Sequence, residues 1–313
     1  MLAPICLFTY NRPDETQKTI EALQLNKLAL QSELFVFSDG PKREKDEAKV
    51  QQTRSVIKGI TGFRKVESIE ATENKGLANS IIDGVSSILE KYGKVIVLED
   101  DLITSSNFLD FMNQALDYYE TDRRIQSVNG YSLQLKSNRA EIYFQQRPFP
   151  WGWGTWADRW NREVFDKAKL NDLIAGDKTL LNQFKKACGN DISRMLTNSL
   201  NGKNDSWYVR WTFDHFRKQT YSVFPSKSFV QNIGHTSEGT HCKGINPYRS
   251  QYLNGQESKI SFPEFSISKK PITKEFLYYF TFSNKLITRI KLLPKRDGRK
   301  VLVEDFIYKL KLR

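Results

Sequence analysis

The sequence has little sulfur and little histidine, and it has no long apolar run. Its 313 residues include three cysteines, Cys6, Cys188 and Cys242, and three histidines. Since no two cysteines form a Cys-x-x-Cys pair, a structural zinc site is not expected. Since no run of about 18 apolar residues occurs, a transmembrane helix is not expected either. Few and widely spaced cysteines are typical of a reducing compartment.

Positive charge is in excess, and it is concentrated near the C-terminus. The chain carries 48 Lys and Arg against 36 Asp and Glu, a formal net charge of +12. Residues 269–313 hold 13 of these basic residues and 4 of the acidic ones, a net of +9. Such an excess indicates a polyanionic partner. Because the remaining chain is nearly neutral, we do not expect it to bind nucleic acid across its main domain.

The first 120 residues alternate between strand and helix patterns, which predicts an α/β fold with a parallel sheet. From about Gln126 the pattern changes to shorter strands, a helical insert and a strand pair. We therefore expect two halves of one domain, 1–125 and 126–261, followed by a basic, aromatic segment at 262–313. The predicted strands are 5–9, 33–38, 64–70, 94–98 and the pair within 222–230; the predicted helices are 14–25, 44–58, 76–92, 107–119 and the insert 165–199.

Three adjacent carboxylates, Glu99, Asp100 and Asp101, follow the most apolar strand pattern. They repel one another, so folding gains nothing from them, and a divalent cation would relieve the repulsion. Oxygen ligands suit Mg²⁺ or Mn²⁺, which complete their shells with substrate phosphates. The alternative is a capping cluster for the helix near Asn107, although Thr104 or Ser105 would cap it better. We expect a metal–phosphate site at this strand end.

Polar residues also follow the other predicted strands, where ligands of parallel sheets bind. Arg12, in the segment that runs from Thr9 to Pro13, is suited to a phosphate or a base edge. Asp39 can contact a ligand or only cap the turn at Gly40. Lys75 can reach an anion or be solvated. For the segment that contains Arg12, the alternative is an ordinary turn between a strand and a helix.

Interleaved Gly and Trp over 149–156 predict a loop with flat apolar faces. Such faces stack on sugar rings or nucleobases. The alternative is that these tryptophans are core between two subdomains. We expect some of both, with Trp151 and Trp153 as the candidates for stacking.

Two later loops supply the remaining candidates. Asp205 is either a cap or turn residue or a general base for an acceptor hydroxyl, with Asp214 as the second choice. His241 lies in a polar, Gly-containing loop where it can add an imidazole to a carboxylate-bound metal. His235 competes for that role.

In this order the motifs resemble those of GT-A-fold glycosyltransferases, and they are similar to inverting family 2 enzymes and the N-acetylglucosaminyltransferase I type. The resemblance implies a Rossmann-like, mostly parallel sheet with helices on both faces, plus a smaller acceptor-side subdomain. Residues 1–125 would bind the nucleotide-sugar, and 126–261 would carry the acceptor site. The likeness covers roughly residues 3–245 and rests on seven segments, 4–12, 38–39, 74–76, 95–102, 149–153, 204–207 and 239–241.

The resemblance also implies roles for single residues. Asp101 would be the direct ligand of Mn²⁺ or Mg²⁺, with His241 as a weaker match to a metal or phosphate role. Asp205 would be the catalytic base, although the Trp-Asp-Asp-Trp pattern of the relative reads Asn-Asp-Ser-Trp here. The donor-binding residues would be Thr9, Arg12, Asp39, Lys75, Glu99 and Asp100, and the stacking residues Trp151 and Trp153.

The implied reaction moves a sugar from a nucleotide-sugar donor, a UDP-sugar, to a hydroxyl of a glycan or lipid-linked acceptor. A single displacement would invert the anomeric configuration. One alternative is a nucleotidyltransferase, which would normally show a Gly-rich basic loop after the first strand; residues 9–13 contain no glycine. The other is a non-catalytic carbohydrate-binding protein, which would not need three adjacent carboxylates.

The C-terminal segment bears on where the protein acts. No targeting segment precedes the first strand pattern at Ala3, so we expect a cytoplasmic protein, peripheral on the inner face of the cell membrane. Residues 276–280 and 286–293 mix apolar, aromatic and cationic side chains, as interfacial segments do. We expect them to meet an anionic membrane surface. The alternative is a tail helix packed on the domain with a solvated basic face.

Overall fold

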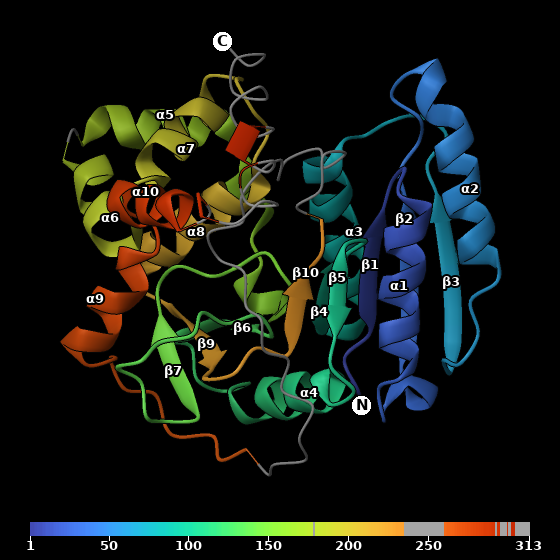
Figure 1. Ribbon diagram of the computed structural model, residues 1–313, viewed down its shortest axis with the longest axis horizontal. Helices are drawn as coiled ribbons and strands as arrows, with labels where there is room; N and C mark the ends of the chain where they lie inside the picture. Colours follow the sequence, from blue (N-terminus) through green and yellow to red (C-terminus); the bar gives the residue numbers. More distant parts are fainter. Residues whose placement is uncertain (178, 235–259, 292, 295–298, 300–301, 304–313) are drawn as a thin grey trace.

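The computed structural model describes residues 1–177, 179–234, 260–291, 293–294, 299 and 302–303. Its centre is an eight-stranded sheet with the strand order β3-β2-β1-β4-β8-β6-β9-β7 (Figure 1). Its strands are β1 (Ile5–Thr9), β2 (Glu33–Ser38), β3 (Lys65–Glu70), β4 (Lys94–Glu99), β6 (Ile125–Asn129), β7 (Ile142–Gln145), β8 (Trp153–Trp156) and β9 (Tyr221–Pro225). A separate two-stranded sheet pairs β5 (Leu102–Thr104) with β10 (Val230–Asn232).

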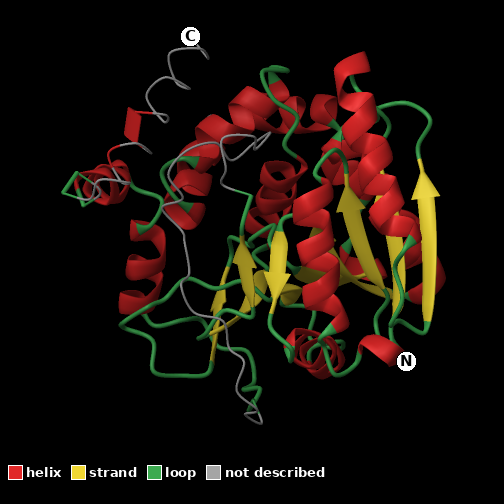
Figure 2. Ribbon diagram, turned by 45° about the vertical axis from the view of Figure 1, so that its right-hand side comes forward, coloured by secondary structure: helices red, strands yellow, loops and turns green. Residues whose placement is uncertain are grey.

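Ten α-helices of the described chain surround the strands, and Figure 2 shows the strands lying between them. They are α1 (Pro13–Gln24), α2 (Glu47–Lys58), α3 (Leu77–Tyr92), α4 (Phe108–Tyr118), α5 (Lys167–Gly176), α6 (Leu180–Cys188), α7 (Ile192–Leu200), α8 (Trp207–Lys218), α9 (Lys270–Tyr278) and α10 (Phe282–Ile290). Within the described residues, no helix combines the length and the apolar character needed to span a membrane.

Strands β1 to β4 are parallel, and β1 is buried along its whole length. Because side chains alternate along a strand, Ile5 and Leu7 pack with α1 and α4 on one face, whereas Cys6 and Phe8 pack with α3 and α8 on the other. The Cys6 thiol lies in the core, and burial raises its pKa. The predicted α/β fold, a mostly parallel sheet with helices on both faces, is confirmed.

The second half of the sheet differs from the prediction in two places. The expected Trp-rich loop contains β8, which lies antiparallel between β4 and β6. Gly154 allows this approach, since a Cβ there would lie 2.9 Å from the carbonyl oxygen of Val95. The expected strand pair within 222–230 is also wrong, because β9 joins the large sheet and β10 pairs with β5. Both errors concern pairing partners that are distant in sequence.

The C-terminal helices lie on the side of the molecule away from α1 and α2 (Figure 1). Phe276 and Phe280 are buried and pack on Phe149, and the Glu275 carboxylate accepts hydrogen bonds from Ser137. The prediction that residues 276–280 face a membrane is therefore wrong for these two phenylalanines, which anchor α9 to the domain. The next helix, α10, buries none of its residues.

Candidate active site

A cleft of about 170 Å³ lies where β1, β2 and β4 end. Parallel strands present their carboxyl ends at one edge of a sheet, so the polar residues that follow them meet there. The described lining brings together most of the predicted site residues. It comprises Phe8, Thr9, Tyr10, Asn11, Arg12, Asp39, Lys42, Asn74, Gly76, Leu77, Ser80, Glu99, Asp100, Asp101, Trp151 and Asn232.

Arg12 pairs with two carboxylates of the acidic triplet. Its Nη1 donates to Oδ2 of Asp101 at 2.8 Å and lies 3.7 Å from Oδ1 of Asp100. The other oxygen of Asp100 accepts from the backbone N–H of Tyr10 at 3.2 Å. Both aspartates are buried, so this guanidinium acts with little screening from solvent.

The backbone of the triplet is held from two sides. The hydroxyl of Thr19, on α1, donates to the carbonyl oxygen of Asp100 at 2.9 Å. After β10, the N–H of Ile233 donates to the carbonyl oxygen of Asp101 at 2.8 Å. A Cβ on Gly234 would lie 1.8 Å from Oδ2 of Asp101, so only glycine lets the chain pass here.

Asn232 is a lining residue that sequence reasoning did not select. Its Nδ2 lies 3.4 Å from Oδ1 of Asp101, where it faces the carboxylate. An asparagine followed two residues later by a glycine, after a strand pattern, was the available signal. Its position depends on the pairing of β10 with β5, and nothing local to either segment indicates that pairing.

Burial is the main cause of the raised pKa values of the carboxyl groups in this cluster. It raises the pKa of Asp100 to about 7 and that of Glu99 well above its ordinary value, and the neighbouring carboxylates add to both effects. The pKa of Asp101 is also raised by burial, although Arg12 opposes the shift. One guanidinium faces three carboxylates, so the cluster is short of positive charge and suited to a further cation.

The donor set fits a divalent cation that is shared with a ligand. Within the described part of the chain, no three His, Cys, Asp or Glu side chains form a group that would hold an ion unaided. Mg²⁺ and similar ions are usually bound by one or two carboxylates together with phosphate oxygens and water. Asp100 and Asp101 supply such oxygens at the cleft, whereas His241 lies outside the described residues.

Asp39 holds the loop at residues 74–76. Its Oδ1 accepts from the N–H of Lys75 at 2.8 Å, and its Oδ2 accepts from the N–H of Gly76 and from Nδ2 of Asn74, both at 3.0 Å. A Cβ on Gly40 would lie 2.5 Å from the backbone of Glu73, so the two loops touch. The loop thus enters the cleft through Asn74 and Gly76, while Lys75 is exposed and absent from the lining.

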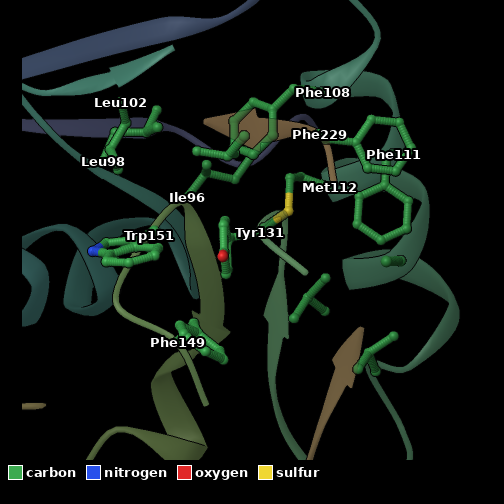
Figure 3. Packing of buried hydrophobic residues seen from close by; sticks show 14 of the residues in the cluster. Ile96, Leu98, Leu102, Phe108, Phe111, Met112, Tyr131, Phe149, Trp151 and Phe229 are labelled. Atoms are coloured by element: carbon green, nitrogen blue, oxygen red, sulfur yellow. The ribbon is translucent and has the colours of Figure 1, made fainter. Parts of the chain in front are cut away.

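The two candidate tryptophans lie in different surroundings. Trp151 lines the cleft and packs on Tyr131 and Phe149, with ring centroids 4.6 and 5.6 Å away (Figure 3). Trp153 is 1% exposed and stacks within a tryptophan cluster that covers the α3 face of the sheet. The structure therefore brings Trp151 to the cleft and leaves Trp153 in the core.

Asp205 stands apart from the cleft lining. Its side chain is 46% exposed, and Oδ1 lies 2.8 Å from Nη2 of Arg210 and 3.0 Å from Nζ of Lys167. The second choice, Asp214, is buried, where it accepts from Nε2 of Gln126 at 2.7 Å and pairs with Lys218 at 2.8 Å. Neither carboxylate lines the cleft in this structure.

No protein-family model and no curated protein matches the chain. Solved structures resemble it at low identity. S. aureus TarS, residues 1–349, is 12% identical with a TM-score of 0.36, over 55% of this chain and 49% of that one. The mannosyltransferase PcManGT from Pyrobaculum calidifontis, in complex with GDP-Man and Mn²⁺, is 9% identical with a TM-score of 0.34, over 54% and 47%.

A UDP-glucose pyrophosphorylase complexed with UDP-glucose is 11% identical with a TM-score of 0.38, over 76% of this chain and 96% of that one. The chain spans about half the length of TarS 1–349 and of the mannosyltransferase. Likenesses of this degree assign neither a substrate nor an activity to the chain.

Proposed function

We propose that the chain is a glycosyltransferase that moves a sugar from a nucleotide-sugar, a UDP-sugar, to a hydroxyl of a glycan or lipid-linked acceptor. The observation that carries the proposal is the cleft itself. The carboxyl ends of three parallel strands meet there. They bring together buried carboxylates, the guanidinium of Arg12, the loop at residues 74–76 and aromatic side chains. A sugar nucleotide presents the matching groups, namely phosphates, a base and a sugar ring.

The lining residues suit the parts of such a donor. Arg12 is placed to pair with the diphosphate, because a guanidinium binds phosphate oxygens in a fixed geometry. Thr9 and the loop held by Asp39 would lie against the nucleoside. Glu99 and Asp100 would contact the donor sugar and the ribose through hydrogen bonds to their hydroxyl groups.

A divalent cation is part of the proposal. Asp101 would hold Mn²⁺ or Mg²⁺, with Asp100 beside it, and the bound ion would supply positive charge where the leaving nucleoside diphosphate becomes more negative. The chain contributes Arg12 to the same end, since its guanidinium already faces both carboxylates. Gly234 keeps space beside Asp101 free of a side chain.

For the general base we retain Asp205, with one displacement at the anomeric carbon and inversion of configuration. Its carboxylate is half exposed, so an acceptor hydroxyl can reach it from solvent. Arg210 and Lys167 fix its orientation. Asp214 is less suitable, because it is buried and its carboxylate is bonded to Gln126 and Lys218.

Calorimetry with UDP and GDP, with Mn²⁺ or with EDTA, tests the site. We expect binding with metal and at least tenfold weaker binding in EDTA, because the triplet repels phosphates unless it is neutralised. Asp101→Asn should remove the metal dependence, while the matched surface variant Asp122→Asn should not. Equal binding in EDTA by the unaltered protein would end the proposed metal role.

A turnover screen with UDP-, GDP- and dTDP-sugars then tests the reaction. Transfer or slow hydrolysis that releases the nucleoside diphosphate supports a glycosyltransferase. Formation of UTP and a sugar 1-phosphate from the UDP-sugar and pyrophosphate would instead identify a nucleotidyltransferase. Nucleotide binding without either product would leave the proposed reaction without support.

A further inference from the structure

Helix α10 is oriented with its polar side toward the domain. Asn284 donates from Nδ2 to the carbonyl oxygen of Tyr279 at 3.1 Å, and Nζ of Lys285 lies 3.9 Å from Asp191. These two residues, with Thr288 and Arg289, are the partly covered positions of the helix. A surface helix normally turns its apolar side to the core, so this orientation requires an explanation.

The outward side of α10 is an apolar stripe made of Phe282, Leu286 and Ile290. Residues four apart lie on one side of a helix, and these three are 78%, 45% and 52% exposed. Ile287 and Leu293 extend the stripe at 40% and 52% exposure. Apolar side chains are stabilised when they leave water, so the stripe is suited to being covered.

Basic residues are frequent in the stretch of sequence that contains the apolar stripe. Residues 276–296 contain five Lys or Arg and no Asp or Glu. Beside the start of α10, a groove between α6 and α9 is lined by Lys185, Lys186, Lys270 and Lys274, and it ends at Thr281, whose hydroxyl caps α10. Glu275, the acidic residue of the described lining, is already bonded to Ser137.

We propose that α10 is a membrane-surface helix, whose apolar stripe inserts at the headgroup level of an anionic phospholipid bilayer while the flanking lysines and arginines bind lipid phosphates. Apolar side chains between cations are what such an interface requires. A second copy is a poorer occupant, because it would bring the same cations together. The last residues of the chain are a poorer occupant for the same reason, because Lys309, Lys311 and Arg313 would bring further cations to this surface.

The surface does not depend on the proposed transfer reaction, so the two can fail separately. Co-sedimentation with phosphatidylcholine vesicles, with and without phosphatidylglycerol, measures it directly on the full chain. We expect binding to the anionic vesicles only, and weaker binding as salt is added. The paired variant Leu286→Gln with Ile290→Gln should lower the affinity at least about tenfold. The circular dichroism spectrum and the melting temperature should not change, which shows that the variant folds.

A matched control is available at the opposite side of the molecule. Leu25 and Leu30 are 74% and 75% exposed, so Leu25→Gln with Leu30→Gln removes the same chemistry elsewhere and should leave vesicle binding unchanged. The charge contribution is tested with Lys270→Gln and Lys274→Gln, which should weaken binding about tenfold. A Phe282→Trp substitution should show a blue shift of tryptophan emission on anionic vesicles.

Three results would overturn the proposal. One is vesicle binding by the Leu286→Gln and Ile290→Gln variant that equals that of the unaltered protein. Another is an absence of binding by the unaltered protein to anionic vesicles. The third is light scattering that shows a dimer which the same variant converts to a monomer, because a second copy would then cover the stripe.

Discussion

The guanidinium of Arg12 lies 2.8 Å from the carboxylate of Asp101, the residue proposed to hold the metal. Arg12 therefore offsets part of the negative charge of the acidic triplet. Removing one partner of a buried ion pair is costly, since the remaining charge stays buried without compensation. The side chains of Arg12 and Asp101 are 15% and 9% exposed, so they form a buried ion pair of this kind.

Arg12→Gln should lower the free energy of unfolding by about 2–4 kcal/mol. Added Mn²⁺ should raise the melting temperature of this variant more than that of the unaltered protein, because the ion replaces the lost positive charge. Thermal unfolding with and without MnCl₂ measures both effects. Arg43→Gln is the control, since the side chain of Arg43 is 59% exposed where it pairs with Asp46 and lies in another ion pair. An equal response of the two variants to Mn²⁺ would contradict the role of Arg12.

Asp39→Asn should loosen the loop at residues 74–76. An amide retains one acceptor oxygen, so at least one of the N–H groups of Lys75 and Gly76 loses its partner. The expected cost is about 1–2 kcal/mol of stability, with UDP binding weakened about tenfold because the loop lines the cleft. Hydrogen exchange of the two amides and calorimetry measure the effects. Unchanged protection of both amides would contradict this account of Asp39.

Asp205→Asn should keep donor binding and reduce turnover by about 10²–10⁴-fold if Asp205 is the general base. Calorimetry with UDP and Mn²⁺ gives the first quantity, and initial rates with the active donor give the second. Asp166→Asn, which affects the N-cap of α5, is the control and should retain turnover. Retained turnover in Asp205→Asn would move the base to another residue.

His215 should make stability depend on pH. Its ring is buried, with Nδ1 bonded to the carbonyl oxygen of Trp211 and Nε2 facing the hydroxyl of Ser127, and burial lowers its pKa to about 4. The unfolded chain takes up this proton near pH 6.5, whereas the folded chain does so only near pH 4. Stability from this group is therefore lost as the pH falls, by about 2 kcal/mol between pH 7 and 5.

Urea unfolding at several pH values, on the unaltered protein and on His215→Gln, isolates this contribution. Buried carboxylates with a raised pKa, such as Asp100, act in the opposite direction and cancel in the comparison. The difference in stability between the two proteins should shrink from pH 7 to pH 5. A difference that stays constant over this range would show that His215 is not held neutral by the fold.

The sequence predicts the first half of the fold closely, because each element there has its own periodic pattern and its own turn residues. Strands β1 and β2 have the predicted bounds, 5–9 and 33–38. The acidic triplet, Arg12 and Asp39 could be placed together for the same reason, since parallel strands end at one edge. What the sequence does not indicate is how Asp39 is used, as its hydrogen bonds go to a loop 35 residues away.

The remaining differences come from long-range packing. Trp153 has the residue type of a sugar platform, but its strand is paired on both sides and its ring packs in the core. Asn232 reaches Asp101 only because β10 pairs with β5. Phe276 has the composition of an interfacial segment, yet the neighbouring phenylalanines of the domain bury it. No pattern within a single segment distinguishes these outcomes.

Strand β8 has a consequence for how the chain can be divided. It pairs with β4 although nearly 60 residues separate them in sequence. The edge of β4 that does not pair with β1 is therefore covered only by a strand from later in the chain. A fragment that stops at residue 125 would leave the apolar strand β4 with a free row of backbone N–H and C=O groups. Such an edge recruits other strands, so this fragment should aggregate on expression, whereas a fragment that retains β8 keeps this edge paired.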